Sequence, residues 1–126
     1  MVEGLSIINY KGKTIVYGNY MTFAEDKSTQ KAKTLELEKA VSAEYSKYST
    51  KTLLALTNVQ NMYFDMDILN AMKNSMDKVS PYMKKSAIVG VKGLAKAGYN
   101  FVIGLANHNT KAFDTEEEAK EWLVKD

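Results

Sequence analysis

The chain has 126 residues, of which 45% are hydrophobic and 25% are charged, with a formal net charge of +2 and no cysteine. This length and composition suit one globular domain, and the absence of thiols excludes disulfides, thiolate metal ligands and cysteine nucleophiles. The small, evenly spread charge lacks the basic stripe that a phosphate backbone requires, so we expect no nucleic-acid partner.

The chain also lacks the signals of export and of membrane insertion. No apolar run approaches the ~20 residues that a membrane-spanning helix needs, and an acid stands near the amino terminus where a secretion signal carries basic residues. These features and the lack of cysteine predict a cytoplasmic protein with a single domain over residues 1–126.

Two segments rich in Ile, Val and Tyr open the chain, at residues 5–10 and 14–20. The short, glycine-containing link Lys11-Gly12-Lys13 between them is typical of a tight β-hairpin. From about Asp26, apolar residues recur at spacings of three and four, which predicts an amphipathic helix. Its expected apolar face comprises Leu37, Ala40, Val41, Tyr45 and Tyr48, and its other faces carry Lys31, Lys33, Glu36, Glu38 and Lys39.

The middle of the chain predicts a strand, a helix and another strand. Residues 52–56 contain the apolar run Leu53-Leu54-Ala55-Leu56, short enough for a strand that is buried on both faces. Asp65 or Asp67 can then cap a helix that ends near Pro81. Its expected apolar stripe is Leu69, Met72, Met76 and Val79. Residues 87–91 repeat the pattern of a buried strand.

The last third predicts two further helices around a short strand. Leu94, Phe101, Val102 and Leu105 would share one face of the first of these helices. Residues 111–113 form at most a short strand. Asp114 or Thr115, followed three residues later by Glu117 or Glu118, gives a capping-box signature before a final helix that carries Ala119, Trp122 and Leu123.

This alternation predicts an α/β fold. We expect a mostly parallel sheet of about five strands, with an antiparallel hairpin at its start and about four helices packed against it.

Four stretches carry a resemblance over nearly the whole chain: YKGKTIVYGNY, LLALTNVQNMYFDMDIL, KKSAIVGVKGL and KAFDTEEEAKEWL. Together they resemble bacterial SpoIIAA-like proteins of the STAS and Sec14-like superfamily. The most telling part runs from Phe113 to Leu123 and is similar to that family's closing F-x-x-x-E-E-A-x-x-W-L pattern. The resemblance implies a sheet flanked by helices.

For function, the resemblance implies two precedents. STAS domains regulate protein partners, and Sec14-like domains associate with apolar ligands or membranes. STAS regulators of anti-sigma factors carry a phosphoacceptor hydroxyl where the central strand runs into the next helix. Here that junction reads Phe64-Asp65-Met66-Asp67. The resemblance therefore does not extend to a phosphorylation switch at this place.

Reactive groups are sparse along the sequence. The single histidine, His108, lies in a polar segment after a helix, where it would suit the negative end of the helix dipole. Gly93 and Gly98 have the spacing of a phosphate loop, but Tyr99-Asn100 stands where a lysine and a hydroxyl should contact phosphate and magnesium. No residue spacing is typical of a metal site. We therefore predict a protein that is not an enzyme and needs no metal or cofactor.

The favoured ligand site lies where the central strand ends, because open α/β sheets bind ligands at the carboxyl ends of their strands. The segment after this strand mixes apolar and amide side chains, and the end of the hairpin has a similar character. If the two stretches adjoin, they can line an apolar pocket with a polar rim. The predicted residues are Tyr20, Met21, Phe23, Asn58, Gln60, Met62, Phe64 and Asp65.

A weaker candidate is an anion or head-group site at Lys92, Gly93 and Lys96, where backbone amides would open a helix.

We predict a non-enzymatic STAS-like module that recognises a protein partner or a nonpolar small molecule, with a preference for homodimerisation. The first alternative is a Sec14-like lipid carrier that contacts membranes peripherally through Lys84, Lys85, Lys92 and Lys96. The second is a hydrolase or transferase that uses His108.

Overall fold

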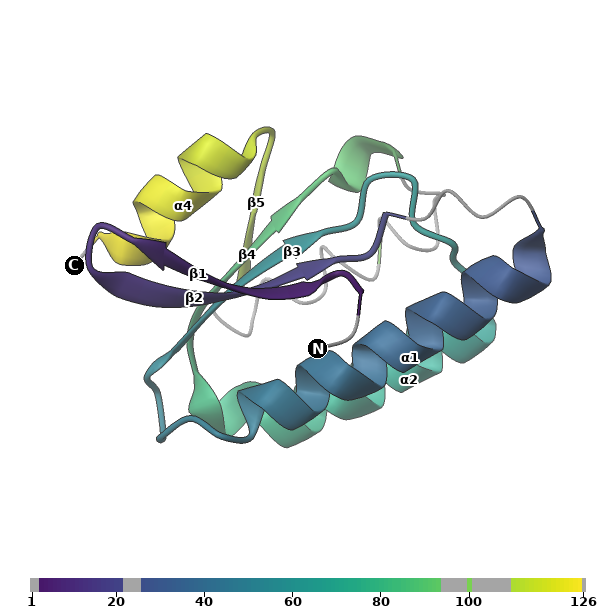
Figure 1. The fold of residues 1–126 in the computed structure, drawn as a ribbon, viewed down its shortest axis with the longest axis horizontal. Coiled ribbons are helices and arrows are strands. Elements are labelled where there is room, and N and C mark those ends of the chain that lie inside the picture. The colour runs from purple at the N-terminus through teal and green to yellow at the C-terminus, as the bar shows by residue number, and fades with distance from the viewer. Residues whose placement is uncertain (1–2, 22–25, 94–99, 101–109, 126) are drawn as a thin grey trace.

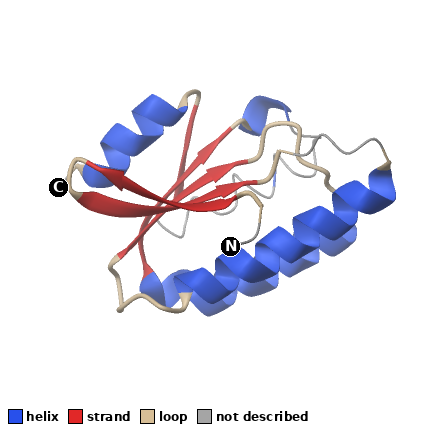
Figure 2. Cartoon of the chain, viewed as in Figure 1, coloured by secondary structure: helices blue, strands red, loops and turns tan. Residues whose placement is uncertain are grey.

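A computed structural model describes residues 3–21, 26–93, 100 and 110–125. Within these residues, five strands and three α-helices form a sheet with helices on both faces (Figures 1 and 2). The strands are β1 (Leu5–Tyr10), β2 (Lys13–Asn19), β3 (Leu53–Asn58), β4 (Met83–Val89) and β5 (Thr110–Phe113). The helices are α1 (Lys27–Tyr45), α2 (Met66–Val79) and α4 (Glu116–Val124), with short 3-10 turns at Ser80–Tyr82 and Val91–Gly93. The helix expected around Leu94 to Leu105 lies outside the described residues.

The sheet is mixed, and its strands lie side by side in chain order, β1-β2-β3-β4-β5. β1 pairs with β2 in antiparallel register, whereas β2, β3, β4 and β5 are parallel. Lys11 and Gly12 join β1 to β2, both with positive φ, which is the backbone that a two-residue hairpin requires. The α/β class and the opening hairpin are confirmed.

Each described helix begins at a side-chain cap. Asp26 and Asp65 accept hydrogen bonds from the backbone amides of Thr29 and Ile68, both at 2.9 Å. Thr115 accepts from the amide of Glu118 at 3.2 Å. These bonds satisfy amides that lack a partner in the first helical turn. Of the alternatives that the sequence left open, Asp65 caps α2 and the pair Thr115 and Glu118 caps α4.

Two hydrophobic cores cover the two faces of the sheet. Side chains of β3 alternate between them, with Leu53 and Ala55 in one and Leu54 and Leu56 in the other. The first core packs under α1 and α2, which lie side by side, and the second under α4 (Figure 1). Because β3 is buried on both sides, its apolar run is continuous rather than alternating.

The start of β4 and the buried face of α2 differ from the sequence-based expectation. β4 starts at Met83 rather than Ala87, since the polar residues that follow Met83 also pair with β3. In α2 the fully buried residue is Ile68, at 1% exposure, whereas Leu69 is half-buried. A polar stretch inside a strand gives no apolar run, so the pattern detected only the second half of β4.

Two lysines stabilise the carboxyl end of α4. The ammonium groups of Lys13 and Lys85 donate to the backbone oxygens of Val124 and Trp122, at 2.9 and 2.8 Å. Cations are favoured there, because the last carbonyls of a helix lack partners and carry partial negative charge. In the described part of the chain, no helix is both long and apolar enough to cross a membrane.

Gly90 follows β4 with φ +88°, and a Cβ there would lie 2.6 Å from the backbone nitrogen of Gln60. Gly12 has a similar φ, +81°, but open space around it. We expect Gly12→Ala to lower the free energy of unfolding by about 1–2 kcal/mol, the cost of a left-handed residue. Gly90→Ala should cost at least ~1 kcal/mol more, because backbone must also move. Urea unfolding of both variants measures the difference, and equal losses would contradict the close approach.

Candidate functional site

A cavity of about 60 Å³ lies between the sheet and helices α1 and α2. Its wall combines apolar and hydroxyl-bearing side chains around one carboxyl group. The apolar part is Val41, Val59, Met62, Phe64, Met72, Met76, Val79, Met83 and Ile88. The polar part is Tyr20, Glu38, Ser42, Tyr45, Thr57, Ser75 and Ser86. An apolar pocket with a few converging polar groups is the usual character of a small-molecule site.

Glu38 supplies the carboxyl group from the middle of α1 and is only 9% exposed. The Tyr20 hydroxyl donates to its Oε2 at 2.5 Å, and the Ser42 hydroxyl donates to its Oε1 at 3.5 Å. Ser75 of α2 adds a further hydrogen bond. Burial raises the pKa of Glu38, and these hydrogen bonds oppose the increase because they stabilise the carboxylate. Among the described residues that line the cavity, the side chains that donate hydrogen bonds to this carboxyl group are all hydroxyl groups.

Two buried phenols flank this carboxyl group. Burial raises the pKa of Tyr20 well above its usual value, and the charge of Glu38 adds to the effect. Burial likewise raises the pKa of Tyr45, with a smaller contribution from Glu38, while a hydrogen bond with Thr57 opposes it. Both phenols are therefore neutral at physiological pH. They act as hydrogen-bond donors and acceptors rather than as ionised groups.

Three of the predicted site residues line the cavity: Tyr20, Met62 and Phe64. The end of the hairpin and the segment after β3 do adjoin, because Met21 and Met62 form an isolated antiparallel bridge. Phe23 lies outside the described residues. The carboxyl end of β3 thus contributes to the cavity, although the helices contribute more of its wall than the sequence suggested.

Asn58 points away from the cavity, toward α4. Its amide nitrogen donates to Glu116 at 3.0 Å, and its amide oxygen accepts from the backbone of Gln60 at 3.0 Å. Glu116 also accepts from the Tyr17 hydroxyl, and burial together with this bond raises the pKa of Tyr17 to about 12. Asn58 therefore orders the turn after β3, and Gln60 is exposed beside it.

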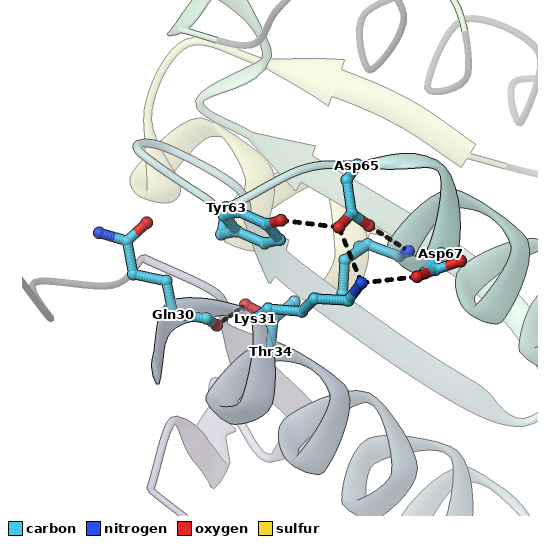
Figure 3. Close-up of polar contacts among 7 residues, drawn as sticks. Gln30, Lys31, Thr34, Tyr63, Asp65 and Asp67 are labelled. Carbon is cyan, nitrogen blue, oxygen red and sulfur yellow. Dashed lines mark hydrogen bonds and ion pairs between the residues drawn. The ribbon is translucent and has the colours of Figure 1, made fainter. Parts of the chain in front are cut away.

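Asp65 joins the two helices instead of facing the cavity (Figure 3). It caps α2 and also accepts from the Tyr63 hydroxyl at 2.7 Å and from the Lys31 ammonium at 3.1 Å. Lys31, from α1, reaches Asp67 as well, at 2.5 Å. Hydrogen bonds from Tyr63, from the backbone and from Lys31 lower the pKa of Asp65 to about 2. We call Lys31, Asp65 and Asp67 the interhelix clasp.

Sequence reasoning placed Glu38 on the polar side of its helix, and this was wrong. Thr34, Glu38, Val41 and Tyr45 are all buried and follow one another at spacings of four, three and four. The same periodicity that identified the apolar face therefore contains an acid. Counting polar residues that share this spacing would have found it.

Among the residues that the structure describes, Lys92 and Gly93 are what remains of the predicted anion site. Lys92 forms an exposed ion pair with Asp114 at 3.0 Å, and Gly93 ends a 3-10 turn. Lys96 and His108 lie outside the described residues. In the described ranges, no group of three or more His, Asp or Glu side chains is arranged to hold a metal ion.

The pKa of Glu38 makes stability depend on pH in a specific direction. Because this pKa is higher in the folded chain, the folded state binds more protons above pH 4.5, and the free energy of unfolding falls as the pH rises. Glu38→Gln keeps the shape and removes the titration. We expect the stability of this variant relative to wild type to increase with pH, by about 1.4 kcal/mol for each unit of difference between the two pKa values. Urea unfolding across pH measures it.

Glu36→Gln, which removes an exposed carboxyl group from the same helix, is the matched control. A stability difference between Glu38→Gln and wild type that stays constant from acid to neutral pH would contradict the burial of a titrating carboxyl group.

The interhelix clasp gives a second prediction. Asp65→Ala removes the cap of α2 and should lower the free energy of unfolding by about 1 kcal/mol. Asp67→Ala removes only an exposed ion-pair partner and should cost less than ~0.5 kcal/mol. Since the folded pKa of Asp65 is about 2, below the unfolded value, its contribution should be full above about pH 4 and decline toward pH 2. Chemical unfolding of both variants at neutral and acid pH tests this, and equal losses would refute the capping role.

Comparison of the chain with protein-family models, with curated proteins and with solved structures finds no match. Membership of the SpoIIAA-like family therefore stays a prediction.

Proposed function

We propose that the chain is a non-enzymatic binding module whose cavity under α1 and α2 holds a small, mainly nonpolar molecule with one polar group. The observation that carries this proposal is the combination of an unfilled space and a buried carboxyl group, Glu38, inside a mainly apolar core. Protein cores are normally close-packed, and polar groups in them are normally few. A space that departs from both rules is a good candidate for a ligand site.

The size of the cavity suits a small occupant. The centre of a water-sized sphere can reach about 60 Å³ of this cavity. One water molecule needs about 10–15 Å³ by this measure, so the cavity admits a small molecule as the wall stands. Four of the lining side chains are methionines: Met62, Met72, Met76 and Met83. Their three rotatable bonds let them change shape at little cost, so the wall can adapt to a larger ligand.

The chemistry of the lining favours binding over catalysis. Tyr20 and Tyr45 stay protonated near neutral pH, so neither phenol is available as a nucleophile or a base. Glu38 could accept a proton, but its hydrogen-bond partners are hydroxyl groups, which do not relay charge to a leaving group in the way that an imidazole does. The alternative that uses His108 has no support from the described residues.

The family resemblance is consistent with this proposal. It implies a STAS-like domain, in which occupation of the cavity would alter the loop after β3 and so the surface that a protein partner contacts. Met62 and Phe64 connect the two places, since both lie in this loop and line the cavity.

The lipid-carrier alternative has weaker support. Among the lysines proposed to meet head groups, Lys85 donates to the end of α4 and Lys92 pairs with Asp114. Lys84 is exposed, and Lys96 lies outside the described residues.

Filling the cavity tests the proposal. Ser75 of α2 lines the cavity, and Lys73 lies exposed on the same helix. We expect butan-1-ol to bind the wild type, with chemical-shift changes in NMR spectra at Val41 and Ile88. Ser75→Leu should weaken binding at least ~tenfold, or about 1.4 kcal/mol. Lys73→Leu places a leucine on the exposed side of the same helix, outside the cavity, and should leave the affinity unchanged. Absence of any shift at the lining residues in the wild type would refute the proposal.

A further inference from the structure

Glu38 is a buried acid whose neighbours in the cavity are all uncharged. Taking a carboxylate out of water is costly, and proteins usually offset the cost with a cation, or else the group becomes neutral. The described lining residues include no lysine, arginine or histidine. Hydroxyl groups of Tyr20, Ser42 and Ser75 surround the carboxyl group instead. When Glu38 is ionised, its carboxylate is therefore only partly hydrogen-bonded and has no countercharge among the described lining residues.

The two carboxyl oxygens of Glu38 accept hydrogen bonds of different length. Oε2 accepts a short bond from Tyr20 at 2.5 Å, whereas the bond from Ser42 to Oε1 is long, at 3.5 Å. A carboxylate has about four acceptor positions, and the three hydroxyl donors leave at least one of them open. A donor that entered the cavity would therefore meet an acceptor that is already in place.

We propose that the ligand of this cavity carries a protonated amine, and that Glu38 pairs with it while an apolar body contacts the methionine wall. This inference rests on the proposed function, because it assigns the chemical class of the molecule that the same cavity holds. The pairing would supply the countercharge that the surrounding residues do not. A charge-assisted hydrogen bond of this kind is about twice as strong as a neutral one.

Other ligand classes fit the charges less well. An anionic ligand would meet Glu38 with like charge at short range, where burial strengthens the repulsion. A neutral ligand that only accepts hydrogen bonds would compete with Glu38 for Tyr20 and Ser42 and would leave the carboxylate without donors. An amine adds donors and leaves the existing bonds intact.

The titratable groups that face Glu38 are the phenols of Tyr20, at the end of β2, and Tyr45, on the same helix; α2 contributes the neutral Ser75. Neither phenol ionises below pH 10. An alkylamine, with a pKa close to that of lysine at about 10.4, also keeps its proton there. Between the ordinary carboxyl range and pH 9, the pairing therefore depends on the ionisation of Glu38 alone, and amine affinity should rise with pH and then level off.

The test compares three probes of equal length, butylamine, butan-1-ol and butyrate, by NMR titration at pH 8. We expect the wild type to bind butylamine more tightly than butan-1-ol by ~10-fold to 100-fold, the range for a hydrogen bond to a charged group. Butyrate should bind more weakly than either. Glu38→Gln should reduce the preference for the amine to about twofold or less, while its affinity for butan-1-ol is retained. Glu36→Gln, which removes an exposed charge from α1, should keep the preference.

The outcomes separate the two proposals. If no probe shifts the lining resonances, the cavity is not a binding site and both proposals fail. If butan-1-ol binds but butylamine binds no better, or butyrate binds best, only the amine assignment fails.

A measurement on the wild type tests the same pairing if the Glu38→Gln variant folds poorly. The affinity of the wild type for butylamine, measured from pH 5 to pH 9, should increase and reach a plateau, while the affinity for butan-1-ol should not increase. An amine affinity that stays flat over this range while Glu38 titrates, followed by the NMR signal of its side-chain carboxyl carbon, would overturn the pairing.

Discussion

The hydrogen bond between Tyr20 and Glu38 is the contact on which the organisation of the cavity depends. It joins the end of β2 to the middle of α1, inside a core that is otherwise closed by aliphatic packing. Aliphatic side chains can repack to fill a space, whereas a carboxyl group must keep its donors at fixed distances and directions. An acid at this position therefore fixes the helix to the sheet at one point and resists complete closure around it.

The energetic cost of this arrangement is offset elsewhere in the fold. On the opposite face of the sheet, Leu54, Leu56 and Ala87 pack against Ala119 and Leu123, and aromatic side chains such as Phe113 and Trp122 pack around this core. Lys13 and Lys85 donate to backbone oxygens at the end of α4, and Tyr17 and Asn58 donate to the side chain of Glu116. One face thus contributes stability through the burial of apolar side chains, and the other holds a buried carboxyl group with a space beside it.

Much of the fold follows from local patterns in the sequence. The hairpin is set by Lys11-Gly12, and the capped helix starts are set by Asp65 and Thr115. Each of these signals acts within a few residues, so a single sequence displays it. The apolar run of β3 also identified a strand buried on both faces.

The candidate site was harder to predict from the sequence, because its polar side chains contact residues that lie far away along the chain. Glu38 has hydrogen-bond partners in Tyr20, which follows β2, and in Ser75 of α2, and Asp65 turns to the interhelix clasp because Lys31 approaches from α1. Periodicity within one helix assigns an acid to solvent by default and contains no information about a donor on another element. The start of β4 was missed for a related reason, since pairing with β3 rather than hydrophobicity holds its first residues in the sheet.

Helices α1 and α2 contact each other in two places, the interhelix clasp and the side chains beside the cavity. The difference between these contacts bears on how a ligand enters. The interhelix clasp is partly exposed to solvent, where water and salt weaken ion pairs, and it lies about two helical turns from Glu38. Near the cavity, the facing side chains of the two helices, Ser42, Met72, Ser75 and Met76, are only half-buried. The helices are therefore joined by ion pairs at their amino ends, whereas beside the cavity several of their facing side chains are partly exposed. A small separation of α2 from α1 at this point would open the cavity without disturbing the sheet, whose hydrogen bonds and second core remain intact.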